Sequence, residues 1–404
     1  MKIVVIGGGA AGFFAAIHAA QTGNQVVLLE KSNKVLAKVK VSGGGRCNVT
    51  TSFTDPGLLI HNYPRGSKEL LGPFNRFGPV QTITWFEERG VALKTEPDGR
   101  MFPVTDSSQT IIDCLTKEAI KSGVDIKFQV PVAKIEIENP GFKIILNEGG
   151  FINADKLIIA TGGNPNLKSY EWLEQLGHSI IPPVPSLFTF NIPVNPFQDL
   201  MGLSVADAQL RIAGSSFLQK GPLLFTHWGV SGPAVLKLSA MAARLLEEKH
   251  YEFVAMINFF PEFKEEEIRE QLKELIQLHP MKKAFGQGFK KLPSRLWERL
   301  CNLAGISENQ KWNETGKKSI NKLVQLLTCL ELQVRGKTTF KEEFVTCGGV
   351  SLKEVNMKTM ESKKVQGLFF AGEVLDIDGV TGGFNFQAAW TTGFIAGNSA
   401  GTTI

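Results

Sequence analysis

Residues 2–30 read KIVVIGGGAAGFFAAIHAAQTGNQVVLLE. The apolar, β-branched run Lys2–Ile6 predicts a buried parallel strand, and it leads directly into a glycine cluster. The alanine-rich residues 10–22 predict a helix, and residues 25–29 predict a second strand. A strand, a glycine turn, a helix and a second strand in this order predict an α/β fold of the Rossmann type.

The glycine turn fits the pattern GxGxxG, with Gly7, Gly9 and Gly12 at its fixed positions. These glycines permit the tight turn, the approach of the backbone to a pyrophosphate and close packing of helix on strand, and the helix start around Ala11 offers free N–H groups to phosphate. Glu30 ends the second strand, 18 residues beyond Gly12, where a carboxylate accepts hydrogen bonds from a ribose diol. The pattern therefore predicts a dinucleotide site without a 2′-phosphate; the alternative is a glycine-rich turn before a packing helix.

A second glycine block, Gly43–Gly45, lies in the sequence VSGGGRCNVT of residues 41–50. It lies where FAD enzymes carry a loop that passes under the pyrophosphate towards the flavin ring, and its bare backbone allows close approach. An arginine after it suits a phosphate or the electron-rich edge of the flavin. A flexible linker is the alternative. The expected cofactor contacts are Gly43, Gly44, Arg46, Cys47 and Asn48, together with Lys31 and Lys38 before the block.

Three further segments complete the predicted site. The strand-like residues 125–137 place Val130 where flavoproteins of this layout hold the adenine with backbone groups. Residues 156–163 read KLIIATGG and predict a buried strand that ends in Thr161 and Gly162. Near the C-terminus, residues 367–396 predict another strand and a glycine turn that begins a helix. The alternative is an ordinary glycine-rich turn and amphipathic helix with no role in cofactor binding. From this segment we expect Gly372 and Glu373 at the ribityl chain and Gly383, Asn385 and Phe386 at the flavin, where a helix N-terminus stabilises negative charge.

The motifs IGGGAAG, SGGGRCN, ATGG, FTHWGVSGP, TCGGV and AGEVLDIDGVTGGFNFQAAW together resemble the BaiN/aminoacetone-oxidase type of bacterial NAD(P)/FAD-dependent flavoproteins. The resemblance implies an FAD-binding domain of glutathione-reductase-like layout, built from both chain ends. It also implies an inserted β-barrel or sandwich and a small helical domain. Members of this family are described as oxidising aminoacetone, reducing unsaturated bile-acid intermediates or making dihydrouridine in 23S ribosomal RNA.

The chain composition sets the expected domain boundaries. The proline-rich residues 182–185 predict the exit from the FAD-binding domain. We expect that domain in residues 1–185 and 346–404, the β-rich insert in 186–259 with 331–345 as candidate further strands, and the helical insert in 260–330.

Two residues are candidates for proton transfer. His227 lies in the sequence FTHWG, and Cys47 follows the second glycine block. A histidine satisfied by turn backbone and a small packing cysteine are the alternatives.

A basic segment suggests a second class of function. Residues 280–322 hold ten Lys and Arg against three Glu, interleaved with Phe285, Phe289 and Trp297. Positive charge with aromatic rings suits RNA phosphates and stacked bases, whereas a solvated helix face over core aromatics is the alternative. Ribosomal RNA and a small molecule are therefore both candidate substrates.

The leading functional hypothesis is an FAD-dependent oxidoreductase that transfers hydride through flavin N5. The alternatives are an RNA-directed enzyme that reduces uridine and an oxygen-dependent amine oxidase of the aminoacetone type. No second GxGxxG motif follows a mid-chain strand, so NAD(P)H is expected only as a transient electron donor. The five cysteines are scattered without a CxxC pair, which predicts no metal site and a reducing, cytoplasmic location. No membrane span is expected. The glycines in the N-terminal apolar run argue against a secretory signal peptide.

Overall fold

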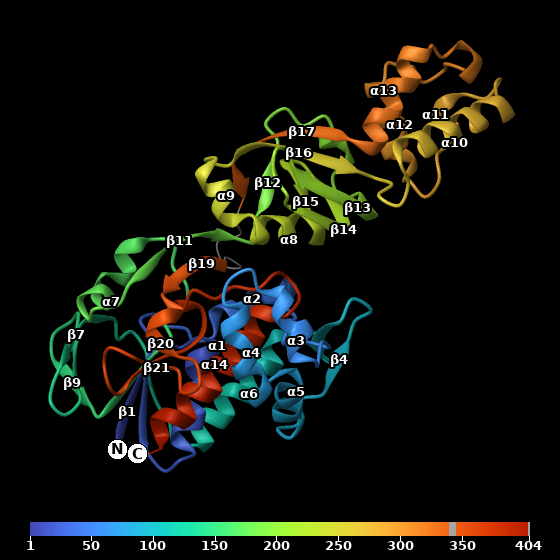
Figure 1. Cartoon of the computed structure of the whole chain (residues 1–404). Coiled ribbons are helices and arrows are strands. Elements are labelled where there is room, and N and C mark those ends of the chain that lie inside the picture. The colour runs from blue at the N-terminus through green and yellow to red at the C-terminus, as the bar shows by residue number, and fades with distance from the viewer. Residues whose placement is uncertain (339–344, 403–404) are drawn as a thin grey trace. The chain divides into compact units, whose positions relative to one another are not determined.

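The computed structural model describes residues 1–338 and 345–402. The chain forms two compact units: unit 1 comprises Met1–Ser186 and Phe340–Ile404, and unit 2 comprises Leu187–Thr339. Unit 1 is thus built from both ends of the chain, as predicted (Figure 1).

Unit 1 contains a seven-stranded sheet in which five neighbouring strands are parallel and two short strands extend one edge through antiparallel pairings. In spatial order the strands are β20 (Val355–Asn356), β21 (Glu361–Ser362), β22 (Leu368–Phe370), β10 (Lys156–Ile159), β1 (Lys2–Ile6), β2 (Gln25–Leu29) and β6 (Asp125–Lys127). β1 lies between β10 and β2, and its residues 3–5 are fully buried, which explains its unbroken apolar sequence. The predicted Rossmann-type α/β fold is confirmed.

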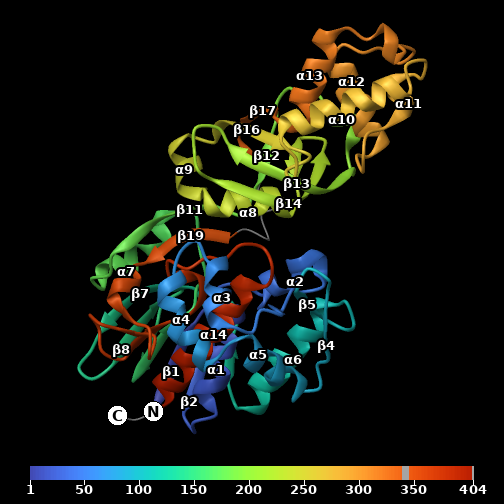
Figure 2. The same ribbon diagram turned by 45° about the vertical axis from the view of Figure 1, so that its right-hand side comes forward.

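Two helices pack tightly on each other in unit 1: α1 (Ala10–Ala20) and α14 (Phe384–Gly401), which lie side by side in Figures 1 and 2. A Cβ added at Gly393 would lie 2.6 Å from the carbonyl oxygen of Ala11, and one at Gly397 would lie 2.4 Å from that of Ala15. Glycines four residues apart therefore let the backbones of the first and last helices meet.

The remaining elements of unit 1 surround this sheet and helix pair. The helices are α2 (Ala37–Gly45), α3 (Pro56–Leu59), α4 (Ser67–Arg76), α5 (Pro79–Glu87), α6 (Ser108–Lys121) and α7 (Glu171–Gln175). Two three-stranded antiparallel sheets are formed by β3 (Thr50–Thr51), β5 (Arg100–Pro103) and β4 (Leu93–Thr95), and by β7 (Val132–Ile137), β8 (Phe142–Leu146) and β9 (Phe151–Ala154).

The proline-rich exit from unit 1 is part of a two-stranded sheet. Residues 182–185 belong to a strand, β11 (Ile180–Ser186), which pairs antiparallel with β19 (Val345–Val350). The register shifts between Ile181 and Val184, so the two prolines that cannot donate hydrogen bonds lie at an irregularity of a two-stranded sheet. The first segment of unit 1 ends at Ser186, the last residue of this strand.

Unit 2 contains a seven-stranded antiparallel sheet. In spatial order its strands are β17 (Leu330–Arg335), β16 (Glu252–Asn258), β13 (Ser204–Ile212), β14 (Leu218–Thr226), β15 (Gly229–Ser231), β12 (Thr189–Asn191) and β18 (Lys337–Thr338). Its helices are α8 (Pro233–Met241), α9 (Ala243–Glu248), α10 (Glu265–Leu278), α11 (Ala284–Gln287), α12 (Ser294–Leu303) and α13 (Lys317–Thr328). One continuous hydrophobic core runs from the sheet into α10–α13. The finer boundary between residues 259 and 260 stays a prediction.

Among the described helices, none combines the length and the apolar character that crossing a lipid bilayer requires.

Candidate cofactor site

In the first glycine turn, two glycines pack against neighbouring backbone and one faces open space. A Cβ at Gly7 would lie 2.3 Å from the oxygen of Ala160, and one at Gly12 would lie 1.9 Å from the oxygen of Gly7. At Gly9, by contrast, an added Cβ has no neighbour within 4 Å. Gly7 and Gly12 therefore hold the turn together, while Gly9 faces free space at the N-terminus of α1, the space that a pyrophosphate needs.

Glu30, the carboxylate predicted to bind the ribose, is hydrogen-bonded to this turn. One oxygen of the Glu30 carboxylate accepts a hydrogen bond from the Gly8 N–H at 2.9 Å, and the other accepts one from the Ser32 N–H at 2.8 Å. A carboxylate has about four acceptor positions, so both oxygens can still accept from ribose hydroxyls. Val130 lies beside it, because the Val130 N–H donates to the Glu30 carbonyl at 2.9 Å. The residues predicted for the adenosine half thus come together, with Lys31 exposed next to them.

The second glycine block ends helix α2 with an abrupt kink. Gly43, Gly44 and Gly45 have φ values of 58°, 68° and 85°, a left-handed run that only glycine adopts cheaply. Cβ atoms at Gly44 and Gly45 would also meet open space. The segment is tied to the first turn, because the Leu36 N–H donates to the Gly8 carbonyl at 2.8 Å. The bare backbone is therefore exposed beside the phosphate turn and does not serve as a linker.

The cationic groups predicted for the site are paired with carboxylates. Arg46 lies 2.6 Å from Glu96 and 3.5 Å from Asp106, and its guanidinium stacks over the Phe102 ring at 4.0 Å. The hydrogen bond to Glu96 is the main cause of the raised pKa of Arg46. This arrangement holds Arg46 away from a phosphate unless it exchanges these partners.

Lys38 is paired in the same way with the predicted ribityl contact. Its Nζ lies 2.7 Å from Glu373, whose other oxygen accepts a hydrogen bond from the Thr346 N–H at 2.7 Å. Gly163, next to Gly162 after β10, approaches the same carboxylate so closely that a Cβ there would lie 2.9 Å from it. Thr161 is exposed at the end of the same strand.

Cys47 and Asn48 have different environments. Cys47 is fully buried, and burial raises the pKa of its thiol to about 12, against a smaller opposing effect of Ser42. With its amide oxygen turned towards α14, Asn48 accepts a hydrogen bond from the Gly383 N–H at 2.8 Å. Asn48 therefore joins the glycine block to the start of the last helix, whereas the Cys47 thiol is a poor proton donor near neutral pH.

The C-terminal segment completes the site. Gly372 adjoins the start of α1, since a Cβ there would lie 2.6 Å from that of Ala11. Asn385 uses its side-chain amide to bridge the N–H and the carbonyl of Gly379, both at 2.8 Å, and Phe386 stacks on Trp390. These two residues thus shape the turn before α14 by local contacts.

Several buried polar residues escaped the sequence prediction. Gln387 accepts a hydrogen bond from the Thr50 hydroxyl at 2.6 Å, and Thr391 donates to the carbonyl of Phe77 at 2.7 Å. Gln387 and Thr391 are fully buried and four residues apart, so they lie on one face of the helix. This spacing is the feature of the sequence that could have predicted their shared role. Gln387 fixes α14 to the segment after the glycine block, and Thr391 fixes it to the end of α4.

His227 lies in unit 2, in the turn between β14 and β15. Its imidazole is exposed and meets the Trp228 ring edge to face at 4.3 Å. Its predicted approach to the cofactor stays a prediction, as do the individual roles of the other site residues. Among the described residues, no cluster of His, Cys, Asp and Glu is suited to hold a metal.

These residues fit FAD. The open face at Gly9, the helix N-terminus behind it and the carboxylate of Glu30 suit a pyrophosphate and an adenosine ribose, and the exposed glycine block leads from there to the N-terminus of α14. FMN has neither an adenosine ribose nor a pyrophosphate.

Comparisons with known proteins agree with this reading. The model of the HI0933-like protein Rossmann domain matches residues 1–399. The ribosomal RNA dihydrouridine synthase of Escherichia coli is 34% identical, over 96% of this chain and 95% of the relative. The 3-dehydro-bile acid Δ4,6-reductase of Clostridium scindens is 29% identical, over 99% and 98%.

Solved structures show the same fold at lower identity. The 3-ketosteroid-Δ4-(5α)-dehydrogenase of Rhodococcus jostii aligns with a TM-score of 0.54 at 15% identity, over 100% of this chain and 97% of that chain. The chain belongs to the HI0933-like family and is an FAD-dependent oxidoreductase.

Proposed function

We propose that the protein reduces uridine to dihydrouridine in ribosomal RNA, with NAD(P)H as the electron donor. The observation that carries this proposal is similarity along almost the whole chain to the Escherichia coli synthase. A second synthase, from Haemophilus influenzae, is 31% identical over 97% of this chain and 96% of the relative. Because the similarity includes unit 2, it extends beyond the cofactor fold that many flavoenzymes share. An RNA substrate also favours a cytoplasmic location.

The basic segment of unit 2 supports an anionic substrate. Lys282, Lys283, Lys290 and Lys291 are exposed, and none of them forms an ion pair with a carboxylate in the described part of the chain. Arg299 is different, since it pairs with Asp199 at 2.5 Å. Unpaired surface cations attract a phosphate backbone and make binding sensitive to salt.

The aromatic residues of the same segment do not contribute to that surface. Trp297 is fully buried, and its indole N–H donates to the Ala284 carbonyl at 2.8 Å. Phe289 is 5% exposed and stacks on Trp297, and Phe285 packs against the same core. For Trp297 and Phe289 the prediction that the rings are available for stacking on bases was wrong, because both are buried in the core of the helices, and Phe285 is half-buried against that core. The proposal therefore rests on charge alone in this segment.

The reaction adds a hydride to C6 of the uracil and a proton to C5, so the C5=C6 bond is reduced by two electrons. Bound FAD would supply the hydride and would regain it from NAD(P)H. Gly9 and Glu30 hold the adenosine and pyrophosphate half in this scheme, and the N-terminus of α14 provides partial positive charge. For the proton we favour His227, whose exposed imidazole has ring nitrogens that can carry a proton. Cys47 is disfavoured by its burial.

A small-molecule enone is the second candidate substrate. The full-length similarity to the bile acid reductase supports it, and the chemistry is related because both reactions reduce a double bond conjugated to a carbonyl group. Oxidation of an aminoacetone-type amine stays a prediction from resemblance.

The test uses unmodified 23S rRNA transcript, FAD-loaded protein and NADPH or NADH. Nucleosides from the digested RNA are then measured by mass spectrometry. We expect dihydrouridine above the level obtained with heat-inactivated protein. A protein that oxidises NAD(P)H with an enone but leaves the transcript unchanged would contradict the proposal and support the second candidate.

A further inference from the structure

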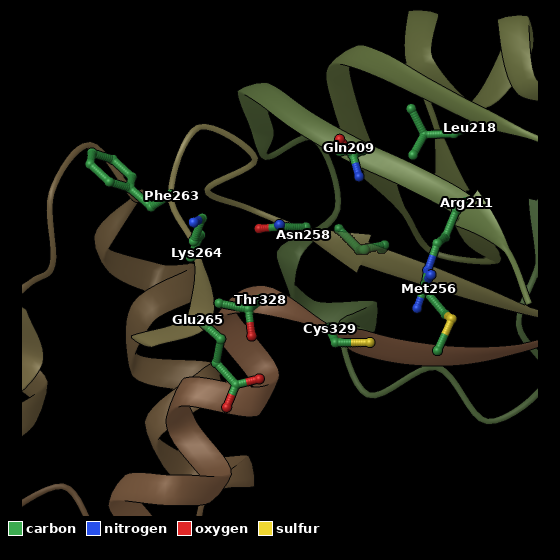
Figure 3. Close-up of a pocket in the computed structure, with 11 residues that line it drawn as sticks. Gln209, Arg211, Leu218, Met256, Asn258, Phe263, Lys264, Glu265, Thr328 and Cys329 are labelled. Atoms are coloured by element: carbon green, nitrogen blue, oxygen red, sulfur yellow. The ribbon is translucent and has the colours of Figure 1, made fainter. Parts of the chain in front are cut away.

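A cavity of about 410 Å³ lies within unit 2, at the base of its helical segment. The chain leaves the sheet there after β16, enters α10, and returns from α13 into β17. The lining includes Gln209, Arg211, Met256, Asn258, Phe263 and Lys264 (Figure 3). Its size falls within the roughly 300–1,000 Å³ range of small-ligand sites.

The floor of the cavity is the outer face of the sheet. Gln209 lies opposite Asn258 across the pairing of β13 with β16, and Arg211 lies opposite Met256. The alternate residues of β13, such as Leu210, are fully buried in the core. Figure 3 shows Gln209 and Arg211 projecting from the same side of β13. Strand periodicity therefore places two amides, one cation and one thioether on a single surface.

The unbalanced charge in this cavity is positive. Neither Arg211 nor Lys264 has a side-chain hydrogen bond or ion pair with another described residue. Glu265, which also lines the cavity, is paired with Arg269 at 2.7 Å. Two cations are thus free for a ligand, while the nearby carboxylate is neutralised, and the cavity is suited to an anion.

The other lining groups suit a planar ligand that has both polar edges and an apolar face. Met256 and Phe263 supply apolar surface. The Asn258 side-chain oxygen already accepts a hydrogen bond from the Phe260 N–H at 2.8 Å, which leaves its amide N–H groups as donors. Gln209 supplies one more amide, with both a donor and an acceptor. A nucleotide combines these features: one phosphate, and one base with hydrogen-bonding edges and a flat face.

We propose that this cavity binds one unpaired nucleotide of the ribosomal RNA substrate, apart from the uridine that is reduced. Arg211 and Lys264 contact its phosphate, Gln209 and Asn258 contact the base edge, and Met256 contacts the base face, while Phe263, which holds Lys290 over its ring at 3.6 Å, lies at the rim of the cavity. This inference rests on the proposed function, since it assigns part of the substrate to a site on unit 2.

The test compares two double variants of the full-length, FAD-loaded protein. In Arg211→Ala/Lys264→Ala the two free cations of the cavity are removed. In the control, Lys249→Ala/Lys273→Ala, two exposed lysines of unit 2 outside the cavity lining are removed. Binding of unmodified 23S rRNA transcript is measured by filter binding at several salt concentrations. Flavin content and NADPH oxidation with an artificial electron acceptor serve as folding controls.

We expect the cavity variant to bind about tenfold more weakly, and its salt slope to fall by about one, because the two cations neutralise a single phosphate. The control should resemble the parent protein. Photocrosslinking of a 4-thiouridine-substituted transcript should label the peptide that contains Met256 or Phe263, and Gln209→Ala should weaken that crosslink without changing the salt slope.

Three results would overturn the inference. If the parent protein forms dihydrouridine but the cavity variant binds RNA like the control, the proposed function stands and the cavity has another role. A raised KM for NADPH with unchanged RNA affinity would assign the cavity to the nicotinamide nucleotide. If the parent protein neither modifies nor binds the transcript, the proposed function fails, and this inference fails with it.

Discussion

The indole N–H of Trp390 donates a hydrogen bond to the carbonyl of Val49, 2.9 Å away, although 341 positions separate the two residues. Trp390 lies in the last helix, and Val49 lies four residues after Gly45, the last residue of the second glycine block; both are fully buried. The Asn48–Gly383 and Thr50–Gln387 contacts lie on either side of this bond. Three successive residues after the glycine block are therefore held against α14, which joins the two halves of the cofactor site.

Replacing Trp390 by phenylalanine should weaken both stability and FAD retention. The smaller ring keeps most of the apolar contact but leaves the buried Val49 carbonyl without its donor, at a cost of about 1–3 kcal/mol. Urea unfolding measures the stability, and the FAD released during dialysis measures retention. Trp172→Phe, which removes a half-buried indole whose N–H donates to the nearby Ser169 carbonyl, is the matched control. Equal FAD loss in both variants would show that the Trp390 contact does not support the site.

Valine at Gly9 and valine at Gly12 should have opposite effects on loading and folding. The Gly9 side chain would enter free space in a backbone conformation with φ −89°, so the chain should fold but exclude the pyrophosphate. At Gly12 the Cβ would lie 1.9 Å from a backbone oxygen, so the fold itself should be lost or strongly destabilised. Far-UV circular dichroism and bound-flavin absorbance separate the two outcomes. A Gly9→Val protein with full FAD content would contradict the assignment of the phosphate site.

Local sequence was sufficient for the β1–α1–β2 segment and for the turn before α14, because each combines an unbroken apolar run with glycines at fixed spacing. Local sequence was insufficient to predict contacts with partners that lie far away along the chain. Proline composition predicted residues 182–185 as the exit from the FAD-binding domain. It did not predict that they form a strand, because that strand depends on pairing with β19. The carboxylate partners of Arg46, Glu96 and Asp106, lie 50 residues or more along the chain, so its guanidinium was assigned to phosphate. Trp297 and Phe289 were predicted to be accessible because they lie near lysines in the sequence. The periodicity of apolar residues does not show which face of a short helix is covered by its neighbours.

We expect the ionised Glu354 carboxylate to make the free energy of unfolding depend on pH in the acid range. Burial alone would raise the pKa of Glu354, but hydrogen bonds from Lys364 and from the N–H and hydroxyl of Ser179 outweigh burial and lower the pKa to about 2. A folded-state pKa below the unfolded value gives stability that is present above about pH 4.5 and is lost as the pH falls towards 2. Glu354→Gln should therefore cost up to about 3 kcal/mol at pH 7 and progressively less below pH 4.5. Urea unfolding at pH 7 and pH 3 measures this difference.

The matched control for that series is Glu138→Gln, at an exposed carboxylate. It should leave the stability nearly unchanged at both pH values. A penalty for Glu354→Gln that stays constant from pH 7 to pH 3 would show that the charge of Glu354 contributes little to stability.

Charge reversal on the basic segment should weaken RNA binding without changing the cofactor. Lys282→Glu/Lys291→Glu alters two exposed lysines that have no carboxylate partner among the described residues. We expect at least a tenfold loss of affinity for 23S rRNA transcript at low salt and a smaller salt slope. Lys117→Glu/Lys121→Glu, on α6 of unit 1, makes the same change in charge and should have a smaller effect. Equal losses in the two variants would indicate a general effect of net charge.

The central claim, that hydride passes from the FAD of this protein to a uridine of ribosomal RNA, is tested most directly by an anaerobic single turnover. The protein is reduced with one equivalent of NADPH and mixed with excess unmodified 23S rRNA transcript. Flavin reoxidation is followed by absorbance, and dihydrouridine is quantified by mass spectrometry. We predict that the flavin is reoxidised only when RNA is present and that about one dihydrouridine forms per FAD. Reoxidation without dihydrouridine, or a flavin that stays reduced with RNA but is reoxidised by a small conjugated enone, would contradict the claim.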